Sequence, residues 1–469
     1  MVVATNVTVK TDDLFLFTQQ IAGEVITPDS VQFDQVRKVQ NISFDRYPLA
    51  IVRAANALDV AEAVTFARKH SITLAVRSGG HSLAGHSMDD DVLVIDLAGM
   101  KRMTVDPVNR IARVQAGATS GDLAEVAGKH GLAITTGDTS SVGFGGLTTG
   151  GGIGFMVRKY GLTIDSLLSA EVVTASGDIL TVSEAAHADL FWAIRGGGGN
   201  FGIVTEFTLR LAPVAQILGG DLILPANREV VRGYLDYTAS APDDLSTIAN
   251  LMYAPPAPFI PEEMVGKLVL SILVCWTGTP EEGAYALAPL RALAEPIADT
   301  VRPMPYADIY LSTAHQAYPH GAAIRSMFAT ELSDEVLDAM IHGMESSSSP
   351  YSIVHLRGLG GEMARVNKDA TAFAHRDARF MVAIIAIWLD PNEDRAAHQA
   401  WADSVWATIH HEASGVYVNF LGSEGEVRVH DAYPPATYAR LQEVKRVYDP
   451  QNLFRLNQNI SPALEADNC

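Results

Sequence analysis

Short apolar runs and amphipathic stretches alternate along the first 213 residues. A helix is predicted after Asn56, because Val60, Ala63, Val64 and Ala67 share one face and asparagine is a favoured N-cap residue. Apolar, β-branched runs predict strands at 50–52, 72–76, 92–97, 110–115 and 202–211. Further helices are expected at 120–130 and 188–195, and a hairpin at 165–181. This part of the chain is therefore expected to mix helices and strands.

The pattern changes near residue 214. Strands such as 267–276 and 379–389 then alternate with long amphipathic segments. Near the C-terminus, 415–421 is strand-like, and a helix is expected from about Pro435 until Asp449. We expect an α+β fold with a first domain at 1–213 (core 45–213), an inserted domain at 214–412 and a return to the first domain at 413–469.

Composition narrows the class of protein. The chain has 469 residues, 48% hydrophobic, and a net charge of −20, which disfavours nucleic acid and anionic membranes as partners. No apolar run is long enough to cross a membrane, and the first residues lack a secretory pattern, so a cytoplasmic protein is expected. The only cysteines are Cys275 and Cys469, and no histidines have zinc-site spacing, so no metal is expected.

Glycine clusters mark the candidate chemistry. The chain has 38 glycines, with clusters at 79–80, 143–154 and 196–199. The third cluster matches a dinucleotide fingerprint, but a helix precedes it and a strand follows it, the reverse of a Rossmann unit. The first cluster follows a strand, where successive backbone amides can form a nest for a pyrophosphate. Arg77 either adds charge there or forms a structural ion pair, and His81 stands directly after the nest.

Several separated segments carry a specific resemblance. They include AVRSGGHS at 75–82, VGFGGLTTGGGIGF at 142–155, DLFWAIRGGGGNFGIVTEF at 189–207 and YVNFLG at 417–422. In this order they resemble the berberine-bridge-enzyme-like flavoproteins, whose FAD domain is of the vanillyl-alcohol oxidase and p-cresol methylhydroxylase type. The terminal segment and the N-terminal half are most similar to the 6-hydroxy-D-nicotine oxidase branch of this family.

The resemblance implies an FAD domain built from both ends of the chain and a substrate domain whose antiparallel sheet covers the flavin. It implies a covalent bond from His81 to the 8α carbon of FAD. Many members add a cysteinyl bond, but Thr139 stands at that position here, so attachment through His81 alone is expected. Valine at the position of Val142 is associated with oxidases. The residues expected to bind FAD are Arg77, Ser78, Gly79, Gly80, His81, Ser82, Thr139, Val142, Gly143, Gly146, Gly150, Gly151, Gly152, Gly154, Gly202, Val204, Tyr417, Asn419 and Asn457.

The acid–base residues depart from the family pattern. Plant members carry a tyrosine at the place of Phe420 and a glutamine or glutamate near Ala383, and both positions are apolar here. An alcohol-oxidising mechanism therefore lacks its family base, whereas hydride transfer from a neutral amine needs no strong base. The candidate catalytic residues that are left are Tyr253, His355, Glu362 and Tyr417.

The leading hypothesis is an FAD-linked oxidase that takes a hydride from a small amine or alcohol and passes electrons to O2, producing hydrogen peroxide. One alternative is a flavin-dependent cyclase or oxygenating enzyme that tailors a polyketide or alkaloid. A second alternative is a non-catalytic protein that binds flavin or a metabolite. The oligomeric state is left open.

Overall fold

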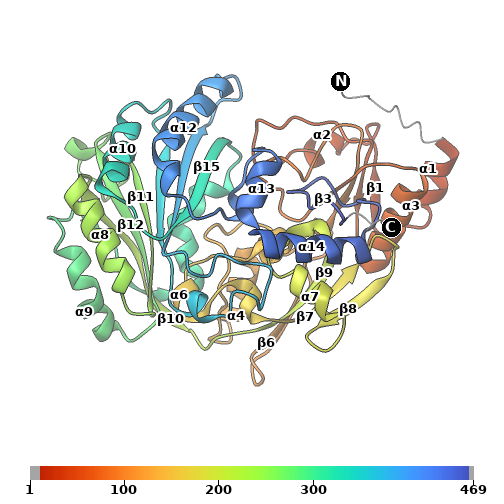
Figure 1. Ribbon diagram of the computed structural model, residues 1–469, viewed down its shortest axis with the longest axis horizontal. Coiled ribbons are helices and arrows are strands. Elements are labelled where there is room, and N and C mark those ends of the chain that lie inside the picture. Colours follow the sequence, from red (N-terminus) through yellow and green to blue (C-terminus); the bar gives the residue numbers. More distant parts are fainter. Residues whose placement is uncertain (1–10, 464–469) are drawn as a thin grey trace, which may run out of the picture.

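The computed structural model describes residues 11–463, which form three sheets with helices packed around them (Figure 1). The first sheet has the strand order β1-β2-β4-β3, in which β2, β4 and β3 run parallel. Its strands are β1 (Glu24–Ile26), β2 (Ala50–Arg53), β3 (Leu74–Arg77) and β4 (Leu93–Asp96). The second sheet is antiparallel, with the order β5-β6-β9-β7-β8. Its strands are β5 (Met103–Asp106), β6 (Ile111–Gln115), β7 (Leu167–Val173), β8 (Ile179–Ser183) and β9 (Ile203–Arg210).

Two helices of this part begin at side-chain caps that the sequence provides. Helix α3 (Ala57–Lys69) starts at Asn56, whose side chain accepts a hydrogen bond from the amide of Asp59. Helix α4 (Ser120–Gly128) starts in a capping box formed by Thr119 and Asp122, and Gly131 follows its end at a φ of 67°. The other helices here are α1 (Thr11–Thr18), α2 (Phe33–Val36), α5 (Phe144–Gly150), α6 (Val157–Tyr160) and α7 (Ala188–Ala193).

The third sheet has eight strands and is antiparallel, with the order β13-β10-β12-β11-β16-β17-β15 and with β14 also paired to β10. Its strands are β10 (Gln216–Pro225), β11 (Leu245–Tyr253), β12 (Leu268–Trp276), β13 (Ala298–Asp299), β14 (Arg302–Pro305), β15 (Gly321–Ala329), β16 (Ile353–Gly358) and β17 (Phe380–Trp388). This arrangement is the antiparallel sheet expected from the resemblance. Strands β9 and β10, on either side of residue 213, belong to different sheets.

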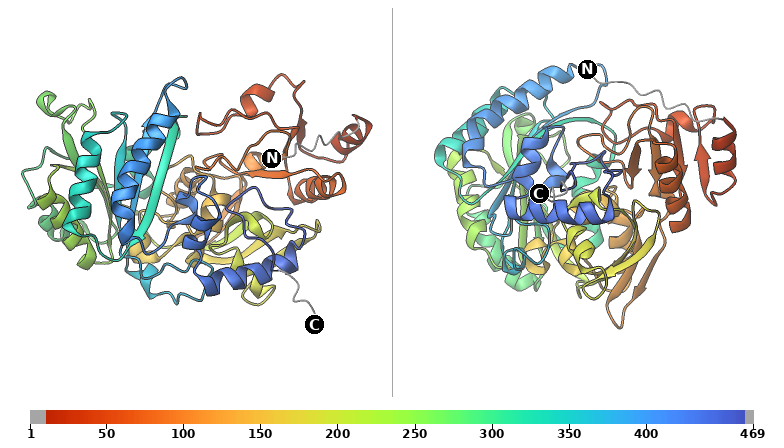
Figure 2. Two further views of the ribbon diagram at one scale, coloured as in Figure 1. Left: turned by 45° about the horizontal axis from the view of Figure 1, so that its top comes forward. Right: turned by 45° about the vertical axis from the view of Figure 1, so that its right-hand side comes forward.

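Helices cover one face of this third sheet and leave the other face for the rest of the molecule. They are α8 (Arg228–Ser240), α9 (Pro280–Arg291), α10 (Asp334–Glu345) and α12 (Arg395–Ile409). In Figure 1 and in the turned views of Figure 2 these green to blue helices lie on the outer side of the sheet. Alternate residues such as Val354, Leu356 and Ile384 point into the core beneath them. The opposite face of the sheet therefore turns towards the first two sheets.

The C-terminal part returns to the first two sheets, as α13 (Glu426–Ala432) and α14 (Pro435–Tyr448) (Figure 1). Lys445 in α14 is fully buried, pairs with Asp449 at 2.7 Å, and donates to the carbonyl oxygens of Asn200 and Phe454. A buried ammonium with three partners fixes this helix against the loop before β9.

The predicted strand at 415–421 is wrong. The segment pairs with β15 only at Gly415, and Val418–Phe420 forms the 3₁₀ helix η7. Its apolar residues, among them Val416 and Leu421, are buried against side chains from other elements rather than by strand pairing. An apolar segment that packs between two layers has the same sequence pattern as a strand.

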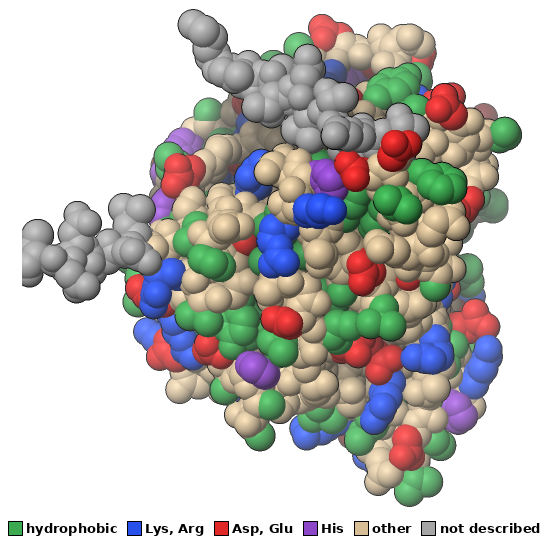
Figure 3. All heavy atoms as spheres, turned by 90° about the vertical axis from the view of Figure 1, so that its right-hand side faces the viewer, with side chains coloured by type: hydrophobic (Ala, Val, Ile, Leu, Met, Phe, Trp, Pro, Cys, Tyr) green, Lys and Arg blue, Asp and Glu red, His purple; other side chains and the backbone are tan. Residues whose placement is uncertain are grey.

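The face that lies far from the third sheet carries basic and acidic side chains interspersed with apolar ones (Figure 3). Acidic side chains therefore do not form one continuous patch on this face. Among residues 11–463 no helix is long and apolar enough to cross a membrane.

Candidate functional site

A cavity of about 430 Å³ lies between the glycine-rich loops, the open face of the third sheet and the segment around η7. Its loop wall contains Ser78, Gly79, Gly80, His81 and Ser82, as the sequence predicts. The other predicted cofactor residues in its lining are Thr139, Val142, Gly143, Gly146, Gly202, Val204, Tyr417, Asn419 and Asn457. Residues that are up to 379 positions apart in the chain thus meet in one cavity.

Glycine is required where two backbones meet behind the loop wall. A Cβ atom on Gly79 would lie 2.3 Å from the amide nitrogen of Gly143, and one on Gly143 would lie 2.1 Å from that of Gly79. The hydroxyl of Ser78 donates to the carbonyl oxygen of Ala116 at 2.6 Å and accepts from the amide of Gly145 at 3.3 Å. These contacts hold the two glycine loops together as one rigid wall.

His81 stands at the end of this loop with its ring in the cavity wall. Its Nε2 lies 3.0 Å from the hydroxyl of Ser141, and Nδ1 has no hydrogen-bond partner among the described residues. Burial, together with the neighbouring His320, lowers the pKa of His81 to about 4. The imidazole is therefore neutral near neutral pH, and it keeps a lone pair for bond formation.

Arg77, which is predicted to bind the cofactor, does not line the cavity. Its guanidinium forms the structural ion pair that the sequence left open: Nη2 lies 2.6 Å and Nε 3.2 Å from the carboxylate oxygens of Asp96. It also donates to the carbonyl oxygen of Val36. Neighbouring parallel strands place this pair side by side, since Arg77 and Asp96 are in register.

Four of the predicted glycines also lie outside the cavity lining: Gly150, Gly151, Gly152 and Gly154. They allow close packing behind the wall. A Cβ atom on Gly154 would lie 1.3 Å from the carbonyl oxygen of Thr136, and one on Gly150 would lie 2.1 Å from the side-chain oxygen of Asn419. The close contacts give these glycines a role in letting neighbouring segments approach.

The lining has the features of a wall built for a bound polar molecule. Gly146 and Gly199 border the cavity, and a Cβ atom on either would meet nothing of the protein within 4 Å. Packing within the protein therefore does not require glycine there, whereas a ligand that lies flat on the wall would. The buried Ser87 hydroxyl and the Oδ1 of Asn457 also line the cavity and have no partner in the structure. These residues fit the FAD that the resemblance implies.

Tyr417 and Asn419 line the cavity from the segment around η7, where the Tyr417 ring packs near Phe328 of β15. The Tyr417 oxygen accepts hydrogen bonds from the amide of Gly152 at 2.8 Å and from the side-chain amide of Asn419 at 2.9 Å. Burial raises the pKa of the Tyr417 phenol. The phenol therefore stays protonated and can act as a hydrogen-bond donor, not as a base.

The sheet wall of the cavity is apolar with one polar position. It contains Ile324 from β15, Ile353 from β16, and Ile385 and Ile387 from β17, together with His355. Cross-strand registry explains this grouping, because Ile353 lies opposite Ile385, and His355 lies opposite Ala383. The wall therefore presents a mainly apolar surface to a substrate.

His355 belongs to a buried network that joins the two walls. Its Nδ1 lies 3.0 Å from Oδ1 of Asn250, and its Nε2 lies 3.4 Å from Nη2 of Arg357. Since an amide oxygen and a guanidinium can only accept and donate, respectively, Nδ1 carries the proton and Nε2 the lone pair. Arg357 is 2% exposed and pairs with Asp138, which lines the cavity from the loop side.

Burial and the nearby Arg357 cation lower the pKa of His355 to about 3. Burial alone would raise the pKa of the Asp138 carboxyl, but the Arg357 cation paired with it holds that pKa below its usual value. At neutral pH the network thus contains a neutral imidazole and one compensated ion pair. Both His355 and Asp138 are weak bases in this arrangement.

Two predicted catalytic residues lie elsewhere. Tyr253 points to the helix-covered side of the sheet, where its hydroxyl donates to the carbonyl oxygen of Met344 at 2.7 Å. Glu362 is on the surface in α11 (Glu362–Arg365) and forms an exposed ion pair with Arg365 at 2.9 Å. Neither lines the cavity. The sequence of β11 alternates, but it does not show which face of the strand is covered by helices.

Asp138, Asn250 and Arg357 also belong to the site and are not predicted from the sequence. Arg357 stands two residues after His355 in β16, so the two residues lie on the same face of the strand. A two-residue spacing of polar side chains in an apolar strand was the available signal, but the partners come from a neighbouring strand and from a loop. Of the cysteines, Cys275 is buried in β12 away from the cavity, and Cys469 lies outside the described residues.

Comparison with known proteins agrees with this geometry. The family described as FAD binding domain matches residues 48–183, and the one described as berberine and berberine like matches 416–461. These matches cover the glycine-loop wall and the segment that contains η7. The chain belongs to the berberine-bridge-enzyme-like family of FAD-linked oxidoreductases.

Individual relatives extend the similarity over nearly the whole chain. An uncharacterised FAD-linked oxidoreductase of Bacillus subtilis is 31% identical over 94% of this chain and 98% of its own. The (R)-6-hydroxynicotine oxidase of Paenarthrobacter nicotinovorans is 32% identical over 94% of this chain and 97% of its own. The crystal structure of 6-hydroxy-D-nicotine oxidase from Arthrobacter nicotinovorans superposes with a TM-score of 0.85 at 29% identity, covering 98% of this chain and 100% of that one. Family, fold and the assignment as an oxidase are thereby confirmed.

Proposed function

We propose that the chain carries FAD covalently on His81 and oxidises a small organic molecule, with dioxygen as electron acceptor and hydrogen peroxide as product. The observation that carries the proposal is the neutral His81 imidazole in the cavity wall, at the end of a glycine loop, whose Nδ1 has no hydrogen-bond partner among residues 11–463. When bound, FAD would supply a ring that accepts a hydride and returns electrons to dioxygen.

Different residues of the cavity would orient the attachment site, leave space for the flavin and offer it hydrogen bonds. The Ser141 hydroxyl orients the His81 ring, and Gly146 leaves space for a flat ligand. The Asn457 oxygen offers an acceptor without a partner in the structure. Thr139 donates to Gln316 at 2.7 Å at the position where other members carry a second linkage, which supports attachment through His81 alone.

The sheet wall favours a neutral amine as substrate over an alcohol. Oxidation of an alcohol requires a base for the hydroxyl proton, and His355, with its pKa lowered to about 3, is a weak one. A neutral amine already has the lone pair that assists hydride loss. The isoleucines of the wall would pack against its hydrocarbon part, and the likeness to 6-hydroxynicotine oxidase supports the same class.

The test is retention of flavin after acid precipitation. Wild-type protein should be yellow and keep its colour in the pellet, whereas His81→Ala should release its flavin to the supernatant. His86→Ala is the matched control, because His86 also lines the cavity and should leave the attachment intact. Wild-type protein whose flavin is fully extractable would contradict the covalent link.

Anaerobic mixing tests the substrate class. Amines with an apolar body should bleach the bound flavin, and readmitted oxygen should restore the colour with one peroxide formed per substrate. Bleaching by alcohols alone would contradict the amine assignment. Labelled oxygen in the product would favour the oxygenating alternative.

A further inference from the structure

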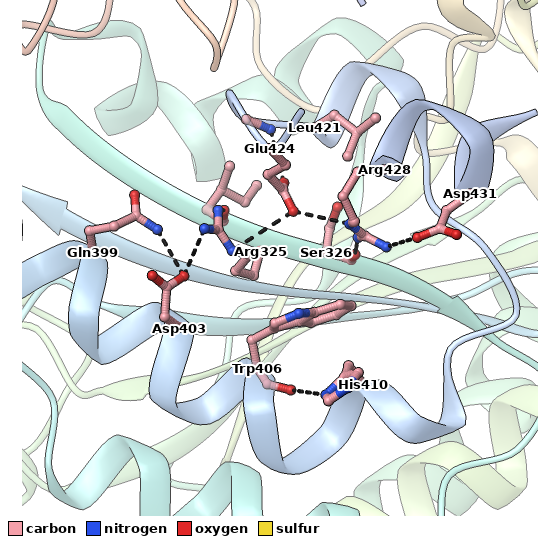
Figure 4. Close-up of polar contacts among 12 residues, drawn as sticks. Arg325, Ser326, Gln399, Asp403, Trp406, His410, Leu421, Glu424, Arg428 and Asp431 are labelled. Carbon is pink, nitrogen blue, oxygen red and sulfur yellow. Dashed lines mark hydrogen bonds and ion pairs between the residues drawn. The ribbon is translucent and has the colours of Figure 1, made fainter. Parts of the chain in front are cut away.

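A cluster of charged side chains joins the C-terminal segment to β15, the edge strand of the third sheet (Figure 4). Glu424 lies at its centre, between Arg325 of β15 and Arg428 of α13. The Glu424 side chain is only 4% exposed. A nearly buried carboxylate between two arginines is rarely placed without a structural or functional reason.

Glu424 connects three backbone segments. Its Oε2 accepts from Nε of Arg428 at 3.1 Å and lies 3.8 Å from Nε of Arg325. Its Oε1 accepts from the amide of Gly422 at 3.1 Å. The two oxygens therefore hold the turn at Gly422 against β15 and α13 at the same time.

The turn at Gly422 directly follows residues that line the cavity. Residues 417–421, which we call the C-terminal wall, all line it. The hydroxyl of Ser326 donates to the carbonyl oxygen of Phe420 at 2.8 Å, and Arg428 donates to the carbonyl oxygen of Ser326 at 2.8 Å. Ile324, two residues before Ser326, belongs to the sheet wall. The same contacts thus fix the C-terminal wall relative to the sheet wall.

Each arginine also has an outer partner that does not touch the C-terminal wall. Asp403 lies 2.8 Å from Nη2 of Arg325, and Asp431 contacts Nη1 of Arg428. Both aspartates are 46% exposed. Arg428 also lies over the ring of Trp406, with its Cζ 4.7 Å from the ring centroid (Figure 4). Loss of the Glu424 charge would leave both arginines with a partner, so the fold should survive it.

We propose that Glu424 is a positioning residue, which sets the spacing between the C-terminal wall and the sheet wall and thereby the fit of the substrate in the cavity. The part of this inference that concerns catalysis rests on the proposed function. The claim that Glu424 fixes the C-terminal wall does not depend on that function, because its contacts are made within the protein without any cofactor or substrate.

Glu424→Gln removes the charge and keeps the shape. Its amide nitrogen would face two guanidinium groups, so one carboxylate contact at least is lost. We expect kcat/KM to fall about tenfold, mainly through KM, because small displacements of positioning groups have large effects on rate and binding. We also expect faster hydrogen–deuterium exchange in a peptide that covers residues 417–422. Glu424→Asp, which keeps the charge, should recover part of both properties.

Asp403→Asn is the matched control, since it removes another ion pair of Arg325 without a contact to the C-terminal wall. It should leave kcat/KM within about twofold and exchange at 417–422 unchanged. Exchange in Glu424→Gln that equals wild type, or an equal change in Asp403→Asn, would overturn the proposal. Should Glu424→Gln not fold, Ser326→Ala must raise exchange at Phe420, and unchanged exchange there would overturn it as well.

The two proposals fail in different ways. A wild-type protein without flavin or oxidase activity would contradict the proposed function, while the exchange experiment would still decide the role of Glu424. An active, flavin-loaded wild type whose Glu424→Gln variant has unchanged KM and exchange would contradict only the positioning role.

Discussion

The loop wall of the cavity is formed mainly by backbone, whereas the sheet wall is formed by side chains. In the loop wall, backbone packs on backbone, as at Gly79 and Gly143, and no added atom fits behind it. The sheet wall consists of side chains, chiefly isoleucines, that stand on a regular antiparallel sheet. Changes in the loop wall should therefore act on the cofactor, and changes in the sheet wall should act on the substrate with the cofactor retained.

The largest expected effect comes from Gly146→Ala in the loop wall. The new methyl group would enter the cavity without touching the protein, so the chain should fold and helix α5 should even gain about 0.5–1 kcal/mol. Flavin loading, measured as the ratio of flavin to protein absorbance, should fall by an order of magnitude or more. Normal loading would show that the cofactor does not lie against Gly146.

Asp138→Asn tests the ion pair that connects the two walls. It leaves the Arg357 guanidinium, 2% exposed, without its counter-charge. We expect a loss of about 3 kcal/mol in the free energy of unfolding, measured by urea titration. Glu362→Gln is the control, because its ion pair with Arg365 is exposed and should contribute less than about 0.5 kcal/mol. Equal effects of the two variants would contradict a special role for the buried pair.

A smaller effect is expected on the pH dependence of stability, through the titration of His355 in the sheet wall. The pKa of His355 is about 3 in the folded chain, below the ordinary value of 6.5, so the unfolded chain binds more protons between these values. The contribution of the neutral His355 to the free energy of unfolding is fully present above about pH 6.5, and it is lost as the pH falls towards 3. When the pH is lowered from about 7 to about 5, this titration should reduce the free energy of unfolding by about 2 kcal/mol.

His355→Gln cannot titrate and keeps a group that can donate to Asn250. Its free energy of unfolding should therefore fall by about 2 kcal/mol less than that of wild type over the same pH range. His81 and His86, whose pKa values are lowered to about 4, contribute with the same sign in both proteins. Parallel pH profiles of the two proteins would contradict a buried neutral His355.

The loop wall was largely predictable from the sequence, and the sheet wall was not. Residues 78–82 are contiguous, and a strand followed by glycines has a local physical meaning, so their place at the cavity could be predicted. Arg77 was undecided because its partner Asp96 lies on a neighbouring strand. The glycines at 150–154 were assigned to the cofactor because a glycine that allows close packing looks like one that faces a ligand.

The sheet wall depends on which face of each strand the helices cover and on cross-strand register. Tyr253 and Asn250 both lie in β11, yet only Asn250 reaches the cavity network, through His355. Glu424 gave no signal either, since its two arginines come from a strand and a helix that meet only in the folded chain. Strand order and helix coverage are set by long-range packing, which no local pattern contains.

The most direct test of the account is mass spectrometry of the proteolytic peptide that contains His81, from wild-type protein with its full complement of flavin. The account predicts a peptide heavier by one FAD less the two hydrogens lost when the bond forms, with fragmentation placing the added mass on His81. An unmodified His81 peptide in fully loaded protein, or the added mass on another residue, would contradict it.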